Sequence, residues 1–91
     1  MKLEQSGIFG RRIKKLKADE KKSLDKAIKK IILDTSVGAM KIGDLSGVQV
    51  YKYKHGVRQY LLAYRVEEKG KLLTLLALGS HENFYRDLKR K

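Results

Sequence analysis

The spacing of apolar residues changes once along the chain, and this change constrains the fold more than any other feature. Before residue 34 apolar side chains recur every three or four positions, which is the period of an amphipathic helix. After residue 47 they alternate or run together in short segments, as strands do. No proline interrupts the 91 residues, and we predict one α+β domain over residues 1–91.

Two helices are predicted in the first half of the chain. In the first, from about residue 6 to residue 17, Phe9 and Ile13 share one face, and Ser6 is a suitable N-cap. A second helix is predicted from about residue 19 to residue 33, again with one apolar face and one lysine-rich face. The two helices are expected to form an N-terminal α-hairpin.

Three strands are predicted in the second half, at residues 48–54, 59–66 and 71–78, with short polar turns between them. Turns of this length predict a small antiparallel meander, with the α-hairpin packed on it. The last strand, KLLTLLAL, is apolar on both faces, which favours a central position in the sheet. Residues 81–91 are expected to form a short C-terminal helix.

Charge points to a polyanionic partner. The chain has 22 lysines and arginines against 10 acidic residues, a net charge of +12, and such a field attracts nucleic acid. The alternative is a lysine coat that only keeps the protein soluble. For the basic residues between positions 11 and 30, on the two predicted helices, we favour solvation over RNA binding.

Several kinds of chemistry are excluded or poorly supported. The absence of cysteine removes disulfides, thiolate catalysis and cysteine-bound zinc, and fits a reducing cytosol. The chain has no signal-peptide pattern and no apolar run of membrane-spanning length, so a cytoplasmic protein is expected. Two histidines without an HExxH motif give poor support for metal catalysis, and no cofactor is expected because nucleotide-binding glycine loops are absent. A hydrolase triad is not supported either, because no serine lies in a GxSxG elbow.

Two lysines stand on the same face of the first predicted strand. Side chains alternate along a strand, so Lys52 and Lys54 project together while Tyr51 and Tyr53 project to the other face. Neighbouring ammonium groups repel one another unless they are solvated or share an anion such as a phosphate. The pair is therefore a candidate phosphate site, with an ordinary solvent-facing strand as the alternative.

The two histidines follow the first and the last predicted strands. In a meander the ends of these strands and the first turn lie near one another, so Lys54, His55, Arg58 and His81 are expected to converge. Imidazole titrates near neutrality and suits proton transfer, although either histidine can be incidental. The chemistry that these side chains support is metal-free RNA cleavage by attack of a 2′-hydroxyl on the neighbouring phosphate.

Two segments, KIGDLSGVQVYKYKHGVRQYLLAYRV and LTLLALGSHENFYRDLKR, resemble the RelE/ParE toxin superfamily, and the likeness covers essentially the whole chain. The phrase around YKYK is similar to RelE, whose paired strand lysines fall on Lys52 and Lys54. The GSH after the last strand resembles the YafQ branch. There the histidine is catalytic, which implies His81 as a general acid, and a following aromatic residue corresponds to Tyr85.

A gapless comparison of residues 51–60 with the same branch places a functional histidine at His55 and an aromatic residue of the site at Tyr60. The match also has departures. The strand arginine of RelE is Leu61 here, and the aspartate of the YafQ branch is Gln59. Only five residues, MKLEQ, are available for the first β-strand usual in the family, so this strand is expected to be short or absent.

The resemblance implies a toxin that cleaves mRNA in the ribosomal A site and is neutralised by a co-encoded antitoxin. The partners expected are thus the cognate antitoxin, mRNA and the 70S ribosome, with a toxin–antitoxin hetero-oligomer. Lys54 or His55 is the base expected, and Arg58 or Arg65 replaces the lost cation. The RNA-binding residues implied are Arg58, Arg65, Tyr60 and Arg86.

Two rival functions remain open. A ParE-like protein has the same fold but inhibits DNA gyrase without nuclease chemistry, and such proteins generally lack the set formed here by Lys52, Lys54 and His81. A non-enzymatic RNA-binding domain also fits the charge. It would bind RNA tightly and in a salt-sensitive manner without cleaving it.

Overall fold

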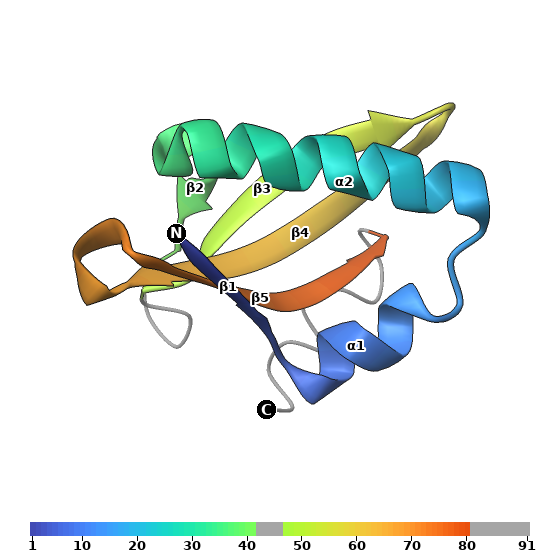
Figure 1. The fold of residues 1–91 in the computed structure, drawn as a ribbon. Helices are drawn as coiled ribbons and strands as arrows, with labels where there is room; N and C mark the ends of the chain where they lie inside the picture. Colours follow the sequence, from blue (N-terminus) through green and yellow to red (C-terminus); the bar gives the residue numbers. More distant parts are fainter. Residues whose placement is uncertain (42–46, 81–91) are drawn as a thin grey trace.

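The computed structural model describes residues 1–41 and 47–80. In these residues two helices, α1 (Gly7–Ile13) and α2 (Ala18–Leu33), pack on one face of a five-stranded sheet (Figure 1). The strands are β1 (Lys2–Gln5), β2 (Ala39–Met40), β3 (Gln49–His55), β4 (Arg58–Glu67) and β5 (Leu72–Ser80). Single 3₁₀ turns, η1 (Thr35–Val37) and η3 (Glu68–Gly70), precede β2 and β5. The predicted α+β class is confirmed.

The order of strands in the sheet is β1-β5-β4-β3-β2. The predicted meander is present, since β3, β4 and β5 pair antiparallel, and β5 lies inside the sheet as its apolar sequence indicated. The sheet is nevertheless mixed rather than wholly antiparallel, because β1 pairs parallel with β5 and fills its outer edge. All four residues of β1 are exposed, so no apolar alternation marked this strand in the sequence.

Ser6 fixes the start of α1 and its position on the sheet. Its Oγ accepts a hydrogen bond from the Phe9 N–H at 3.1 Å, which is the predicted N-cap, and donates to the Leu76 carbonyl at 2.7 Å. Leu76 is the extra residue of a bulge in β5, where the pairing with β4 shifts register. The helix ends at Ile13 rather than near residue 17, because the N–H groups of Lys15 and Leu16 bond to carbonyls three residues back instead of four. Lys17 is then extended and serves as the N-cap of α2.

The main core lies between the helices and the sheet. It contains ten buried residues: Phe9, Leu24, Ala27, Ile31, Tyr60, Leu62, Tyr64, Leu73, Leu75 and Leu78. The helices therefore share one core; α1 packs mainly on β5 and α2 on β3, as Figure 1 shows, so they do not form a hairpin that stands by itself. Each fully buried leucine of this kind stabilises the fold by about 1.5–3 kcal/mol.

A smaller core lies on the other face of the sheet, which we call the open face because both described helices pack on the opposite side. It contains Val48, Val50, Leu61, Ala63, Leu76 and Ala77. In β3 and β4 these residues alternate with those of the main core, as a sheet buried on both faces requires. The open face is thus apolar at its centre.

Candidate functional site

Lys52 and Lys54 lie on the open face, in β3. They alternate with Tyr51 and Tyr53, which pack against the main core on the opposite face. The predicted placement of the lysines and the tyrosines on opposite faces of the strand is therefore confirmed. Both lysines are exposed, and their Cα atoms are about 6.6 Å apart at the usual rise of a strand. No ion pair joins either lysine to an acidic residue within residues 1–41 and 47–80.

Arg65 also lies on the open face, in β4 opposite Thr74 of β5. Its Nη1 atom is 3.8 Å from Glu67 Oε1, and both side chains are about half exposed. An exposed pair at this distance contributes little to stability, and the arginine remains accessible to a ligand. Arg65 is therefore a third cation on the same open face as Lys52 and Lys54, at some distance along the sheet from the β3–β4 turn.

His55 lies on the helix face of the sheet, away from the two lysines. Its Nδ1 atom is 2.6 Å from Ser23 Oγ, and its Nε2 atom is 3.1 Å from Asp19 Oδ2, so both ring nitrogens are bonded to α2. The bond from the imidazole lowers the pKa of the Asp19 carboxyl. The structure thus separates His55 from Lys54, although the two are adjacent in sequence, and ties the β3–β4 hairpin to the start of α2.

Tyr60 connects β4 to the same turn of α2 by a second hydrogen bond. Its hydroxyl donates to Glu20 Oε2 at 2.5 Å, while Glu20 Oε1 accepts from the Lys17 N–H at 3.0 Å. The bond between Tyr60 and Glu20 lowers the pKa of Glu20 and raises that of Tyr60. The Tyr60 ring stacks on Tyr53 at 5.6 Å and is only 5% exposed, so neither ring face is free for an RNA base.

Arg58 begins β4 and lies on the helix face with Tyr60, where it lines a pocket of about 610 Å³. We call this hollow the end pocket, because it lies where the β3–β4 hairpin and the last residue of β5 approach the two helices. Its described lining is Arg12, Lys15, Leu16, Glu20, Arg58, Gln59, Tyr60 and Ser80. Arg12 and Lys15 were absent from the predicted site, and their i, i+3 spacing was the one available signal.

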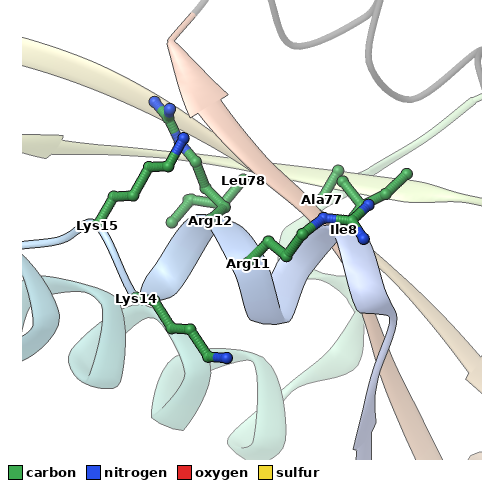
Figure 2. A pocket seen from close by; sticks show the side chains of 7 residues that line it. All are labelled: Ile8, Arg11, Arg12, Lys14, Lys15, Ala77 and Leu78. Carbon is green, nitrogen blue, oxygen red and sulfur yellow. The ribbon is translucent and has the colours of Figure 1, made fainter.

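A neighbouring pocket of about 410 Å³ lies along α1 (Figure 2). Its apolar described residues are Ile8, Ala77 and Leu78, and its charged ones are Arg11, Arg12, Lys14 and Lys15. Figure 2 shows Arg12 and Lys15 extending side by side toward the C-terminal end of β5, whereas Lys14 points the opposite way. Two of the four cations therefore contribute to both pockets.

His81, Tyr85 and Arg86 lie outside the described residues, so the predicted convergence of His81 with the other side chains stays a prediction. His81 directly follows Ser80, which pairs with Tyr60 in the sheet. Across residues 1–41 and 47–80 there is no cluster of three or more histidine or carboxylate side chains placed to hold a metal ion. None of the helices in that part of the chain has the length and apolar character needed to cross a membrane.

Three solved structures, each 20% identical to this chain, share this architecture. A chain of the intact Escherichia coli RelBE toxin–antitoxin complex has a TM-score of 0.70 at 20% identity, covering 89% of this chain and 96% of that one. The isolated Escherichia coli RelE toxin gives 0.67 at 20% identity, with 98% and 96% covered. The conserved hypothetical protein HP0892 from Helicobacter pylori gives 0.61 at 20% identity, with 89% and 94% covered. The fold is therefore that of the RelE-like toxins.

The sequence itself matches a family model. Residues 3–89 match the ParE-like toxin of type II bacterial toxin–antitoxin systems, and the chain belongs to this family. No curated protein sequence matches it. The resemblance seen in the sequence is thus confirmed at the level of the superfamily.

Proposed function

We propose that this toxin is a metal-independent endoribonuclease that cleaves mRNA on the ribosome and so inhibits translation. The observation that carries the proposal is the pair of exposed lysines, Lys52 and Lys54, on the open face of β3 without an acidic partner in the described chain. Two lysines on one face of a strand, with Cα atoms about 6.6 Å apart, are placed to hold a phosphate and to stabilise charge that develops on its oxygens.

The reaction that fits this pair is attack of the 2′-oxygen on the adjacent phosphorus, with departure of the 5′-oxygen of the next nucleotide. A base removes the 2′-proton and an acid gives a proton to the leaving oxygen. We assign the acid role to His81. We assign the base role to Lys54, which acts in its neutral amine form and becomes an ammonium beside the phosphate once it has taken up the 2′-proton. His55 has both ring nitrogens bonded to α2, which favours a positioning role for it.

The remaining predicted residues take binding roles in this proposal. Arg58 and Arg65 are cations on either face of the β4 strand, and Tyr85 and Arg86 are proposed to contact the RNA near His81. Tyr60 is assigned instead to support of the hairpin, since its ring is buried and its hydroxyl is bonded to Glu20.

We also propose a cognate antitoxin as the protein partner, in a toxin–antitoxin hetero-oligomer. The support is the family itself and the similar fold of RelE, which was solved in a complex with an antitoxin. A net charge of +12 favours an acidic or amphipathic antitoxin segment, as it favours mRNA and the ribosome.

The test is cleavage of ribosome-bound mRNA in a purified translation system. Wild type is expected to cut the message, and Lys52→Ala/Lys54→Ala and His81→Ala are each expected to lower the rate about 100-fold or more. The matched control is Lys26→Ala/Lys29→Ala, which removes the same charge from exposed positions of α2 and should keep the wild-type rate. Undiminished cleavage by both site variants would remove the assignment.

Inhibition of DNA gyrase is the rival function, and the ParE-like description of the matched family favours it. Induction of the toxin separates the two. An endoribonuclease halts protein synthesis before any DNA damage arises, whereas a gyrase inhibitor produces DNA breaks first. Breaks that precede the loss of translation would replace the proposal with its rival.

A further inference from the structure

The end pocket gathers three cations from three parts of the chain. Arg12 lies in α1, Lys15 in the connection to α2, and Arg58 at the start of β4. The acidic residue in its described lining is Glu20, whose two oxygens are already bonded to the Lys17 N–H and the Tyr60 hydroxyl. The charge of Glu20 offsets part of this positive charge, and an anion in the hollow relieves the repulsion that remains among the three cations.

The basic side chains at the end of α1 and in the connection to α2 point in different directions. Arg12 and Lys15 extend together toward the end of β5, while Lys14 points the opposite way (Figure 2). Lys14 also lines a different hollow, together with Lys21. The i, i+3 spacing of Arg12 and Lys15 is what places them on the same side of a helical turn. The basic residues around the end of α1 therefore fall into two groups, and Arg12 and Lys15 are the group that faces the end pocket.

The lining of the end pocket favours phosphate over an acidic peptide. Arg12 and Arg58 carry guanidinium groups, which bind phosphate oxygens in a bidentate manner, and Gln59 and Ser80 add hydrogen-bonding groups. Leu16 is the one aliphatic residue in the described lining. An amphipathic peptide has little apolar surface to bury here, in contrast to the adjacent pocket with Ile8, Ala77 and Leu78.

We propose that the end pocket is a second phosphate subsite, in which Arg12, Lys15 and Arg58 bind a backbone phosphate of the same single-stranded RNA that Lys52 and Lys54 engage. In identifying the polyanion as RNA, this inference rests on the proposed function. The two regions adjoin at one residue pair, because Gln59 lines the end pocket and pairs with Lys54 across β3 and β4. The RNA then passes around the end of the sheet at the β3–β4 hairpin.

The test measures binding of a single-stranded RNA of about ten nucleotides, within the range of such sites. The probe carries 2′-O-methyl groups throughout, so that it cannot be cleaved, and fluorescence anisotropy gives Kd over a range of salt concentrations. For single strands the slope of log K against log salt changes by about 0.7 for each phosphate that the protein neutralises. Arg12→Ala/Lys15→Ala is expected to flatten the slope by about 0.7 or more and to weaken Kd several-fold.

The charge-matched control is Lys14→Ala/Lys21→Ala, which removes two exposed lysines that line another hollow. The slope of log K against log salt for this control should lie closer to that of wild type than the slope for Arg12→Ala/Lys15→Ala does. An equal loss of affinity and slope in both double variants would overturn the subsite, because the binding would then follow total charge. Displacement of the RNA by polyglutamate of matched charge at equal concentration would overturn it in favour of an acidic peptide site.

NMR shifts on RNA binding and the ribosomal cleavage assay distinguish failure of the subsite from failure of the proposed function. In an amide NMR spectrum of the wild type, RNA should shift the Gln59 and Ser80 signals, and shifts confined to β1 would contradict the proposal. Failure of the proposed function would appear separately, as an absence of ribosomal cleavage by wild type while the slope change at Arg12 and Lys15 persists. If the subsite alone is wrong, cleavage will still depend on Lys52 and Lys54, but Arg12→Ala/Lys15→Ala and Lys14→Ala/Lys21→Ala will show equal salt slopes in RNA binding.

Discussion

Tyr64 is the side chain that joins β4 to the segment between α2 and β3, and Tyr64→Phe tests how much this junction contributes to stability. The residue is fully buried. Its hydroxyl donates to the Thr35 carbonyl at 2.6 Å, and accepts from the Gly38 N–H at 2.9 Å and from Gln49 Nε2 at 3.2 Å. Replacement by phenylalanine removes this oxygen and leaves the ring in place.

The magnitude follows from what each partner retains. The Thr35 carbonyl and the Gln49 amide keep their bond to one another at 2.7 Å, so neither is left unsatisfied. The Gly38 N–H loses its partner beside the core, and an unsatisfied buried donor costs about 1–3 kcal/mol. We expect a loss of about 2 kcal/mol in the free energy of unfolding, which lowers Tm by about 8–16 °C in a domain of this size.

Urea unfolding followed by circular dichroism gives the free energy, and a thermal scan gives Tm. The matched control is Tyr51→Phe, because Tyr51 is half-buried on the same face of the sheet and its hydroxyl has no hydrogen bond within the described chain. The control should change stability by less than about 0.5 kcal/mol. Equal losses of stability in the two variants would refute the account of Tyr64 as a hydrogen-bonded junction.

A methyl group added at Gly38 would lie 2.6 Å from Tyr64 Oη, so Gly38→Ala should lower the free energy of unfolding by about 1–3 kcal/mol in the same urea experiment. Gly7→Ala should instead raise the free energy of unfolding by about 0.4–1 kcal/mol, since Gly7 is helical with open space around it. A more stable Gly38→Ala or a less stable Gly7→Ala would contradict these expectations. Stability should also fall with pH below about 4. The hydrogen bond from His55 lowers the pKa of the Asp19 carboxyl from its ordinary value of 3.8. The stabilisation by this carboxylate is therefore complete above the ordinary pKa and is lost as pH falls through the lower pKa of the folded state. A plot of Tm against pH checks this, and Asp19→Asn must make the acid decline shallower.

Most of the fold could be predicted because it depends on periodicity. Helix α2 and strands β3, β4 and β5 begin and end within two residues of their expected limits, since each buries a face whose spacing is visible in the sequence. Strands β1 and β2 could not be seen in this way. Both are exposed edges held by backbone hydrogen bonds and by their neighbours, and such edges leave no apolar pattern.

The candidate site was predictable only in part. Alternation along one strand is a local property, so the common face of Lys52 and Lys54 followed from the sequence. The bonds of His55 to α2 join residues 32 and 36 positions apart, and nothing local specifies them. The end pocket depends likewise on how α1 is oriented against β5, which the chain settles through Ser6 and the bulge at Leu76.

The parallel pairing of β1 with β5 also sets an order of events during synthesis. The bond between Ser6 and the Leu76 carbonyl spans 70 residues, so β1 leaves the ribosome well before β5 and cannot pair until β5 has emerged. Contacts of such long range slow folding, because the loop between them has to be closed first. The position of α1 is set by this late contact. The end pocket is therefore assembled only after β5 has emerged, and a nascent toxin chain lacks this surface until residues 72–80 have left the ribosome.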